Sequence, residues 1–169
     1  TNWSGIGDRE FWADATMASS SYSNISTSTV GAVLLASESY SAGKTITIDN
    51  SKVSGSSNLT NFPILISSTL DTLKTTTNGG SVTDDNGYDI IFTSDLAGTV
   101  QLDHEIESYA STTGEIVMWV EIPTLDYNDD TVIYMYYGNN TISTSQESAT
   151  GVWDSNYVAV LHMAEDPSI

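Results

Sequence analysis

Short runs of β-branched and aromatic residues, separated by clusters of Gly, Asn, Asp and Ser, recur along the chain from Lys44 onward. This pattern is typical of β-strands joined by turns in sandwiches and barrels. The expected strands cover residues 44–49, 62–67, 89–93, 99–109, 116–123, 131–137 and 157–163. Seven strands suffice for a sandwich. We therefore predict an all-β fold, an antiparallel β-sandwich of jelly-roll or immunoglobulin-like type, with an extended N-terminal segment.

Two of these runs, 116–122 and 132–137, are largely apolar on both alternating faces. Strands of this kind are covered on two sides, so we expect them at the centre of the fold. The connection between them, residues 123–130, is short and polar, which favours an antiparallel hairpin. Residues 70–74 are too few for a stable helix, and we expect a turn there.

Residues 1–43 differ from the rest of the chain and are interpreted as an N-terminal extension in front of a sandwich domain at 44–169. The extension contains an uncharged, β-prone stretch over residues 29–37. Such a stretch can add as a donor strand to the exposed sheet edge of a neighbouring copy. The candidate residues for strand exchange are Val30, Ala32, Val33, Leu34 and Leu35. The alternative is that the same stretch folds back onto its own domain as a first strand.

The charge is strongly one-sided, because 22 acidic residues face only four basic ones, for a formal net charge of −18. Nucleic acids and anionic lipids are bound through clusters of Lys and Arg, so neither is an expected partner. No stretch approaches the roughly 18 apolar residues of a membrane-spanning helix, and no span is expected. The chain opens without a basic and apolar leader, which is typical of a mature form.

The chain has no cysteine, so its location has to be inferred from other features. It is rich in Ser and Thr, poor in Lys, and carries four Asn-x-Ser/Thr glycosylation sequons, at Asn2, Asn24, Asn58 and Asn139. Together these features favour an extracellular or cell-surface protein.

From Lys44 to Asp166 the order of motifs resembles the family known as domain of unknown function 2341. The motifs are ITID at 46–49, NFPILI at 61–66, YDIIFT at 88–93, HEIESY at 104–109, WVEIP at 119–123, MYYGN at 135–139 and VWD at 152–154. The resemblance implies a β-sandwich module of bacterial or archaeal surface proteins, often followed by a laminin-G-like, concanavalin-like lectin domain. The family has no established catalytic residues to carry over. This sequence stops where the lectin domain would start and has some forty additional residues in front. We therefore expect either a fragment or processed form, or a chain whose downstream part is not represented.

The densest group of titratable residues is the run from Asp103 to Glu107. On a strand, His104 and Ile106 share one face while Asp103, Glu105 and Glu107 share the other. We interpret the acidic face as solvated, and we expect no catalytic residues and no enzymatic activity. His162 and Glu165 are three residues apart, but they follow a strand-like run, which favours a packed terminal strand over a metal site.

Two acidic loops cluster oxygen ligands of the kind that calcium prefers. Their candidate calcium ligands are Asp84, Asp85, Asn86 and Asp89 in one loop and Asp126, Asn128 and Asp130 in the other. The same residue types build ordinary tight turns, and neither loop has the full EF-hand pattern. Turn formation and calcium binding therefore both remain open, and no other cofactor is expected.

The aromatic residues Tyr134, Tyr136, Tyr137, Trp119 and Trp153 are predicted to pack in the core rather than to form a platform for sugars. The sequence thus favours a non-catalytic structural subunit of a surface assembly or filament, with copies of itself as partners. The alternative is a carbohydrate-binding or adhesion module that contacts surface glycans or proteins.

Overall fold

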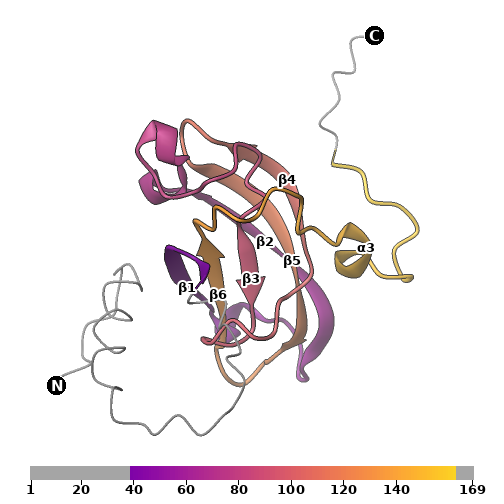
Figure 1. The fold of residues 1–169 in the computed structure, drawn as a ribbon. Helices are drawn as coiled ribbons and strands as arrows, with labels where there is room; N and C mark the ends of the chain where they lie inside the picture. The colour runs from indigo at the N-terminus through magenta and orange to yellow at the C-terminus, as the bar shows by residue number, and fades with distance from the viewer. Residues whose placement is uncertain (1–38, 163–169) are drawn as a thin grey trace, which may run out of the picture.

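The computed structural model describes residues 39–162, which form two antiparallel three-stranded sheets packed face to face (Figure 1). Sheet one has the order β1-β6-β3, with β1 at Ala42–Ile48, β6 at Thr131–Tyr137 and β3 at Ile91–Thr93. Sheet two has the order β2-β5-β4, with β2 at Leu59–Thr69, β5 at Glu115–Leu125 and β4 at His104–Ala110. The predicted all-β sandwich is confirmed.

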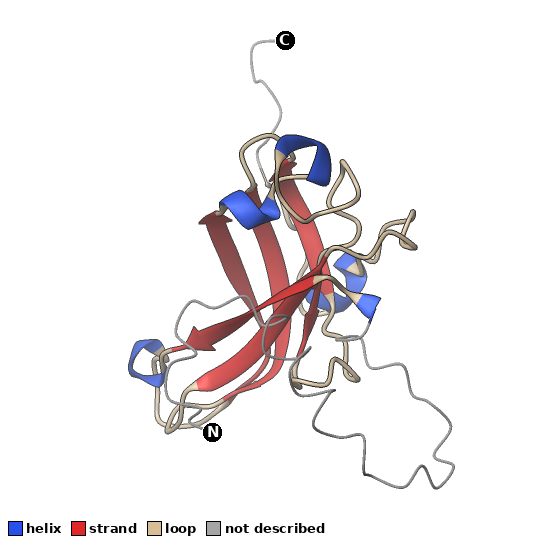
Figure 2. Ribbon diagram, turned by 60° about the vertical axis from the view of Figure 1, so that its left-hand side comes forward, coloured by secondary structure: helices blue, strands red, loops and turns tan. Residues whose placement is uncertain are grey.

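The helical segments are short and lie outside the strands, three of them in connections between strands and one after β6 (Figure 2). They are the 3₁₀ turns η1 (Asn50–Lys52), η2 (Asp71–Leu73) and η3 (Thr76–Asn78), and one α-helical turn, α3 (Ala149–Val152). The turn expected at residues 70–74 is therefore present, as η2. Within residues 39–162 no helix is long and apolar enough to cross a membrane.

The core lies between the two sheets and follows from the alternation of the central strands. Ile116, Met118, Val120 and Ile122 of β5 are buried against Ile133, Met135 and Tyr137 of β6. Each such side chain contributes about 1.5–3 kcal/mol through removal of apolar surface from water. Strand β6 is also covered on its other face, where Tyr136 packs with Tyr40 and Ile91. Tyr40 and the first residues of β1 precede the boundary predicted at residue 44.

The expected hairpin between the two central strands is wrong. Strands β5 and β6 are each the middle strand of a different sheet, and the loop between them crosses from sheet two to sheet one. This loop lies against the β1–β2 connection, where the Asn50 side-chain amide donates to the Asn128 carbonyl at 2.5 Å. The reason is that both strands carry a full apolar face, and two such faces are best buried against each other in opposite layers.

The strand expected at 157–163 is also wrong, because residues 157–162 form no strand. Their apolar side chains do not reach the core: Val158 is 102% exposed and Leu161 is 78% exposed. Of the run expected at 99–109, only the part from His104 onward forms a strand. Before it, Leu102 N donates a single hydrogen bond to the Phe92 carbonyl. Residues 1–38 lie outside the described part, with the strand-exchange candidates and the sequons Asn2 and Asn24.

Candidate functional site

The outer face of sheet two carries the main cluster of polar and aromatic side chains. Strand β4 alternates as predicted, with His104 buried in the core and Glu105 on the outer face. Glu105 lies opposite Trp119 of β5. The pairing register shifts between Ile106 and Ser108, so Glu107 is the extra residue of a β-bulge. A bulge re-aims side chains locally, and here Glu107 also reaches Trp119.

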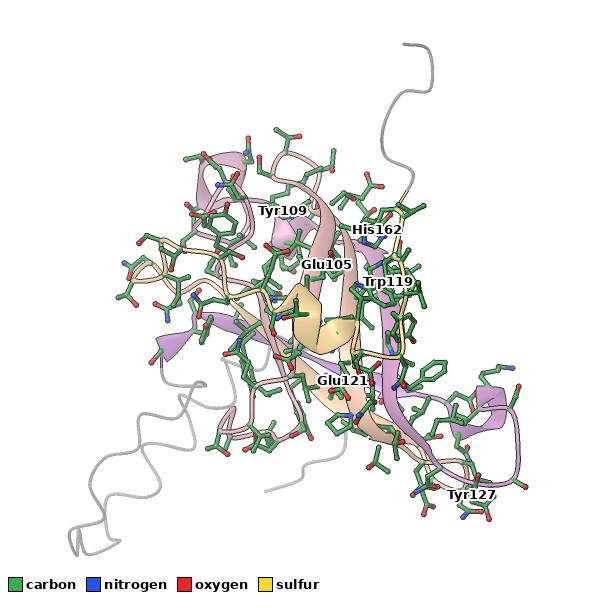
Figure 3. All side chains as sticks on the ribbon, turned by 90° about the vertical axis from the view of Figure 1, so that its right-hand side faces the viewer. Glu105, Tyr109, Trp119, Glu121, Tyr127 and His162 are labelled. Atoms are coloured by element: carbon green, nitrogen blue, oxygen red, sulfur yellow. The ribbon has the colours of Figure 1, made fainter. Side chains whose placement is uncertain are left out.

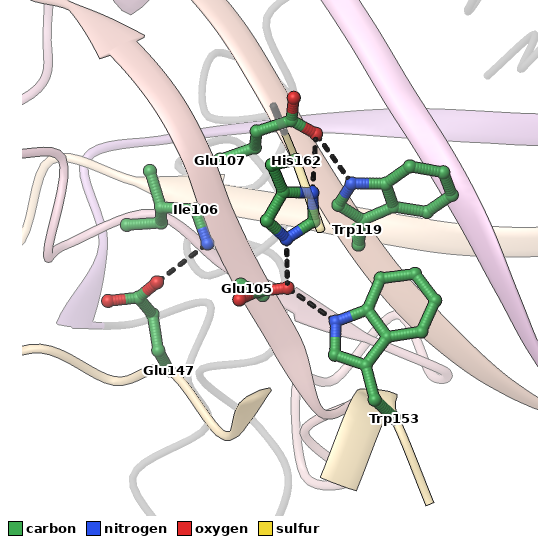
Figure 4. Close-up of polar contacts among 7 residues, drawn as sticks. All are labelled: Glu105, Ile106, Glu107, Trp119, Glu147, Trp153 and His162. Carbon is green, nitrogen blue, oxygen red and sulfur yellow. Dashed lines mark hydrogen bonds and ion pairs between the residues drawn. The ribbon is translucent and has the colours of Figure 1, made fainter. Parts of the chain in front are cut away.

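Each of the two carboxylates accepts a hydrogen bond from an indole and faces the imidazole of His162 (Figure 4). Glu107 Oε2 accepts from Trp119 Nε1 at 2.7 Å, and Glu105 Oε2 accepts from Trp153 Nε1 at 2.5 Å. His162 Nε2 lies 3.2 Å from Glu105 Oε2, and His162 Nδ1 lies 3.3 Å from Glu107 Oε2.

The solvated acidic face predicted for Asp103, Glu105 and Glu107 is therefore wrong for the two glutamates, whereas Asp103 is exposed. The side chains of Glu105, Glu107 and His162 are only 20%, 26% and 25% exposed. The segment after α3 folds back across sheet two and covers them. Neither Trp153 nor His162 is near Glu105 in sequence, at separations of 48 and 57 residues, so alternation along one strand gave no signal for this cover.

The aromatic rings form a continuous chain along this face. Trp119 and Trp153 meet edge to face with ring centroids 5.0 Å apart, and Trp153 meets Tyr157 in the same way at 5.1 Å. The predicted core position is correct for Tyr136 and Tyr137 but wrong for Trp119 and Trp153, which are half-buried on the outer face. Their indole N–H groups need acceptors when they leave water, and on this face Glu107 and Glu105 provide them.

A further carboxylate, Glu121, lies on the same face of β5, apart from His162 and Trp119 (Figure 3). Burial, followed by the charges of Asp103 and Asp154, raises the pKa of Glu121. This end of the face thus carries crowded negative charge, in keeping with the strongly acidic composition.

The first acidic loop is organised around one buried carboxylate. Asp89 is fully buried, and its Oδ2 accepts hydrogen bonds from Thr83 N and Oγ1, Gly138 N and Asn139 N at 2.8–3.2 Å. Its Oδ1 accepts from Asp84 N at 3.0 Å. Burial, followed by the charge of Asp89, raises the pKa of Tyr40 to about 12. Asp89 is therefore a structural carboxylate whose oxygens are occupied by protein donors rather than open to a metal ion.

Of the remaining calcium candidates, Asp84, Asp126 and Asp130 accept hydrogen bonds from backbone N–H groups of the loops. Asp84 Oδ1 accepts from Asn86 N, and Asp126 Oδ1 accepts from Asn128 N, each at 2.8 Å. Asp130 Oδ1 accepts from Asn50 N at 2.9 Å. In the part of the chain that the structure describes, no group of three or more His, Asp or Glu side chains is placed to hold a metal ion. Calcium binding at these loops stays a prediction.

The two sequons within the described residues differ in accessibility. Asn58 is exposed beside Asp126, whereas Asn139 is buried and its Oδ1 accepts from Thr141 N and Oγ1. Because a glycan has to extend into solvent, Asn58 is the better acceptor of the two.

His104 is a buried histidine whose ring nitrogens make no hydrogen bond. Neither ring nitrogen has a partner of normal geometry, and the ring packs edge to face on Phe92 at 5.7 Å. Burial lowers the pKa of His104, and the nearby Leu102 carbonyl opposes this shift only in part. The unfolded chain therefore binds a proton more readily than the folded one, and stability falls as the pH drops below the unfolded value of about 6.5.

Replacing His104 with leucine is expected to raise the free energy of unfolding by about 1–2 kcal/mol at neutral pH, because two unsatisfied buried nitrogens are removed. The gain should increase between neutral pH and about pH 5, where the wild-type histidine resists protonation. Urea denaturation across this pH range measures both effects. A less stable H104L variant, or one with the wild-type acid dependence, would contradict the assignment.

Comparison with known proteins gives one match. Residues 86–156 match the family model described as domain of unknown function (DUF2341). No curated protein and no solved structure matches the chain. The matched range contains β3 to β6 and α3, with Glu105, Glu107, Trp119 and Trp153, and it ends before His162. The resemblance inferred from the sequence motifs is therefore confirmed over residues 86–156, which are similar to the DUF2341 family.

Proposed function

We propose that the protein is a non-catalytic structural subunit of an extracellular assembly on a bacterial or archaeal surface. In this proposal, residues 30–35 of one copy add as a strand to β2 of the next copy. The observation that supports this proposal is that β2 is an uncharged edge strand. Its inward-facing side chains are only partly covered by the rest of the domain.

The inner face of β2 is open at its outer edge. Phe62, Ile64 and Ile66 lie opposite Ile122, Val120 and Met118 of β5. The three β5 residues are buried, whereas Phe62 is 40% exposed and the two isoleucines of β2 are half-buried. Within residues 39–162, β2 pairs with β5 alone. A further strand beyond β2 would cover these side chains and use the free backbone groups of the edge.

The composition of β2 also favours pairing. Native proteins protect exposed edges with charges, prolines or covering segments. Strand β2 carries no charged residue in its 11 positions, although the chain as a whole has 22 acidic residues, and Pro63 is its main interruption. By contrast, the edge of β4 is covered, because Ser148 N donates to the His104 carbonyl and Ile106 N donates to Glu147 Oε1.

The predicted donor stretch fits such an edge, since residues 29–37 are largely apolar or small and largely β-prone. A strand contributed by one copy to a different surface of the next is a head-to-tail contact, which produces a filament when the rotation does not close. If the stretch folds back within one copy, it pairs with the same edge. The stretch is then needed for the stability of the monomer, whereas a donor strand is needed only for assembly.

Charging the β2 edge is expected to prevent assembly without unfolding the monomer. The double variant Leu65→Lys/Ser67→Lys places two positive charges at exposed positions of β2. We expect the concentration needed for polymer formation to rise at least about tenfold, equivalent to about 1.4 kcal/mol. Val132→Lys is the matched control, because Val132 is a similarly exposed apolar residue on the central strand of the other sheet. Sedimentation velocity and electron microscopy measure the assembly.

Deletion of residues 1–38 separates the alternatives. Loss of polymer with unchanged thermal stability is expected for a donor strand, whereas loss of monomer stability would show a strand that folds back. Wild-type protein that stays monomeric under varied conditions, or a charged β2 edge that still polymerises normally, would overturn the proposal.

A carbohydrate-binding or adhesion role is the second candidate. The observation that favours it is the ring chain Trp119–Trp153–Tyr157 on an outer sheet face, of which Tyr157 is exposed. Sugar faces stack on such rings, and neighbouring carboxylates accept hydrogen bonds from hydroxyl groups. A glycan array on the intact chain distinguishes this role, because a purely structural subunit should give no selective signal.

A further inference from the structure

Residues 153–162, here called the strap, run from the end of α3 across the outer face of sheet two. At one end of the strap Trp153 is anchored to Glu105, and at the other His162 lies between Glu105 and Glu107 (Figure 4). We propose that His162 is a pH-operated latch, which holds the strap on β4 when it is protonated and releases it when it is neutral.

The geometry favours the doubly protonated ring. A neutral imidazole has one N–H group and one lone pair, whereas an imidazolium has two N–H groups. Both nitrogens of His162 face a carboxylate oxygen, Nε2 at 3.2 Å and Nδ1 at 3.3 Å. Only the charged ring can donate to both. Deprotonation would set a lone pair against one of the two anions and leave that contact repulsive.

The groups around His162 provide no substitute for its charge. From β4 it faces Glu105 and Glu107, and the rings of Trp119 and Trp153 pack nearby from β5 and from the start of the strap. Among residues 39–162, the one Lys ion pair joins Lys74 to Asp71, away from this cluster. When His162 loses its proton, the two glutamates are therefore left as neighbouring anions with no positive partner.

The rest of the strap has few other attachments. Its backbone turn ends with the bond from Tyr157 N to the Asp154 carbonyl, and within the described part no backbone hydrogen bond joins residues 158–162 to the sheets. Val158 and Leu161 point into solvent. Loss of the His162 contacts should thus free residues 158–162, while Trp153 stays bound to Glu105 and packed on Trp119.

Release would change the surface as well as the path of the chain. The His162 ring lies 6.4 Å from the Trp119 ring, so its departure uncovers one side of that indole. One proton would thereby control the exposure of an aromatic surface.

Spin labels on the strap and on the sheet can test the latch. The sequence has no cysteine, so Leu161→Cys and Ser67→Cys provide the only two attachment sites, both at exposed positions. His104→Leu removes the only other histidine. Double electron–electron resonance should give a narrow distance distribution at about pH 5.5 and a clearly broader one at about pH 8.5, the range over which histidine changes charge.

Two variants identify the group responsible. His162→Gln should give the same distribution at both pH values, because glutamine does not titrate. Glu107→Gln should broaden the distribution at about pH 5.5, since it removes one of the two anions that the charged ring contacts. The latch is refuted if the labelled protein with His162 gives one distribution at both pH values, or if the His162→Gln variant keeps the pH response.

Discussion

Replacing Asp89 with asparagine is expected to lower the free energy of unfolding by at least about 3 kcal/mol. The Asp89 carboxylate accepts five hydrogen bonds from four residues, and it is fully buried. An asparagine of the same size keeps one acceptor oxygen but turns an N–H₂ group toward backbone N–H donors. Those donors then lose their acceptor in a place that water does not reach, and each such loss costs about 1–3 kcal/mol.

Asp95→Asn is the matched control for Asp89→Asn. Asp95 also accepts from nearby donors, namely Thr99 N, Thr99 Oγ1 and Val100 N, but it lies in a more accessible loop. Water can replace the lost acceptor there, so we expect a cost of about 1 kcal/mol or less. Urea denaturation measures the loss in the free energy of unfolding for both variants, provided that their m-values equal that of the wild type. Equal costs for the two variants would show that Asp89 does not organise the buried network.

Gly114→Ala is expected to destabilise the protein by about 3 kcal/mol or more. Gly114 closes the β4–β5 hairpin with φ of +71°, where its N–H donates to the Ala110 carbonyl and its carbonyl accepts from Leu70 N. An added Cβ would overlap the Leu70 carbonyl oxygen and would come within 2.9 Å of Lys74 N. These are backbone atoms, which cannot move aside as a flexible side chain can.

Gly79→Ala isolates the contribution of the backbone conformation. Gly79 has a similar φ of +88°, but a Cβ there would meet nothing within 4 Å. Its alanine variant should therefore lose only the roughly 1–2 kcal/mol of the left-handed conformation. Thermal or urea unfolding gives the free energy of unfolding of each alanine variant. The difference between the two values is the cost of the steric overlap between residue 114 and the backbone on either side of η2. If the two variants lose equal stability, the approach is looser than the structure shows.

The parts of the fold that were predictable from sequence are those set by local alternation. The apolar faces of residues 116–122 and 132–137 identified the two central strands, and the alternation at 102–107 placed His104 inside and Glu105 outside. Such patterns specify which way side chains point, because successive residues of a strand face opposite sides. They do not specify which strands pair, and the expected hairpin between β5 and β6 failed for that reason.

The features missed from sequence depend on contacts between distant residues. Asp89 was a calcium candidate because its loop is acidic, but its partners Gly138 and Asn139 lie 49 and 50 residues away. The cover over Glu105 and Glu107 comes from Trp153 and His162, in a run whose valines and leucine were typical of a strand. The burial of a carboxylate by distant residues does not change the alternation of polar and apolar positions in the sequence. The same holds for a segment that folds back over a sheet.

The interleaving of the two sheets has a consequence for folding. Sheet one is built from the first, third and last strands and sheet two from the other three, and Ala42 pairs with Tyr137. Sheet one spans residues 42–137, so its strands meet across long stretches of sequence and folding is expected to be slow. A chain emerging from the ribosome cannot close sheet one until β6 has been synthesised. Until then β1 and β3 have no partner strand within their own sheet, because both pair with β6.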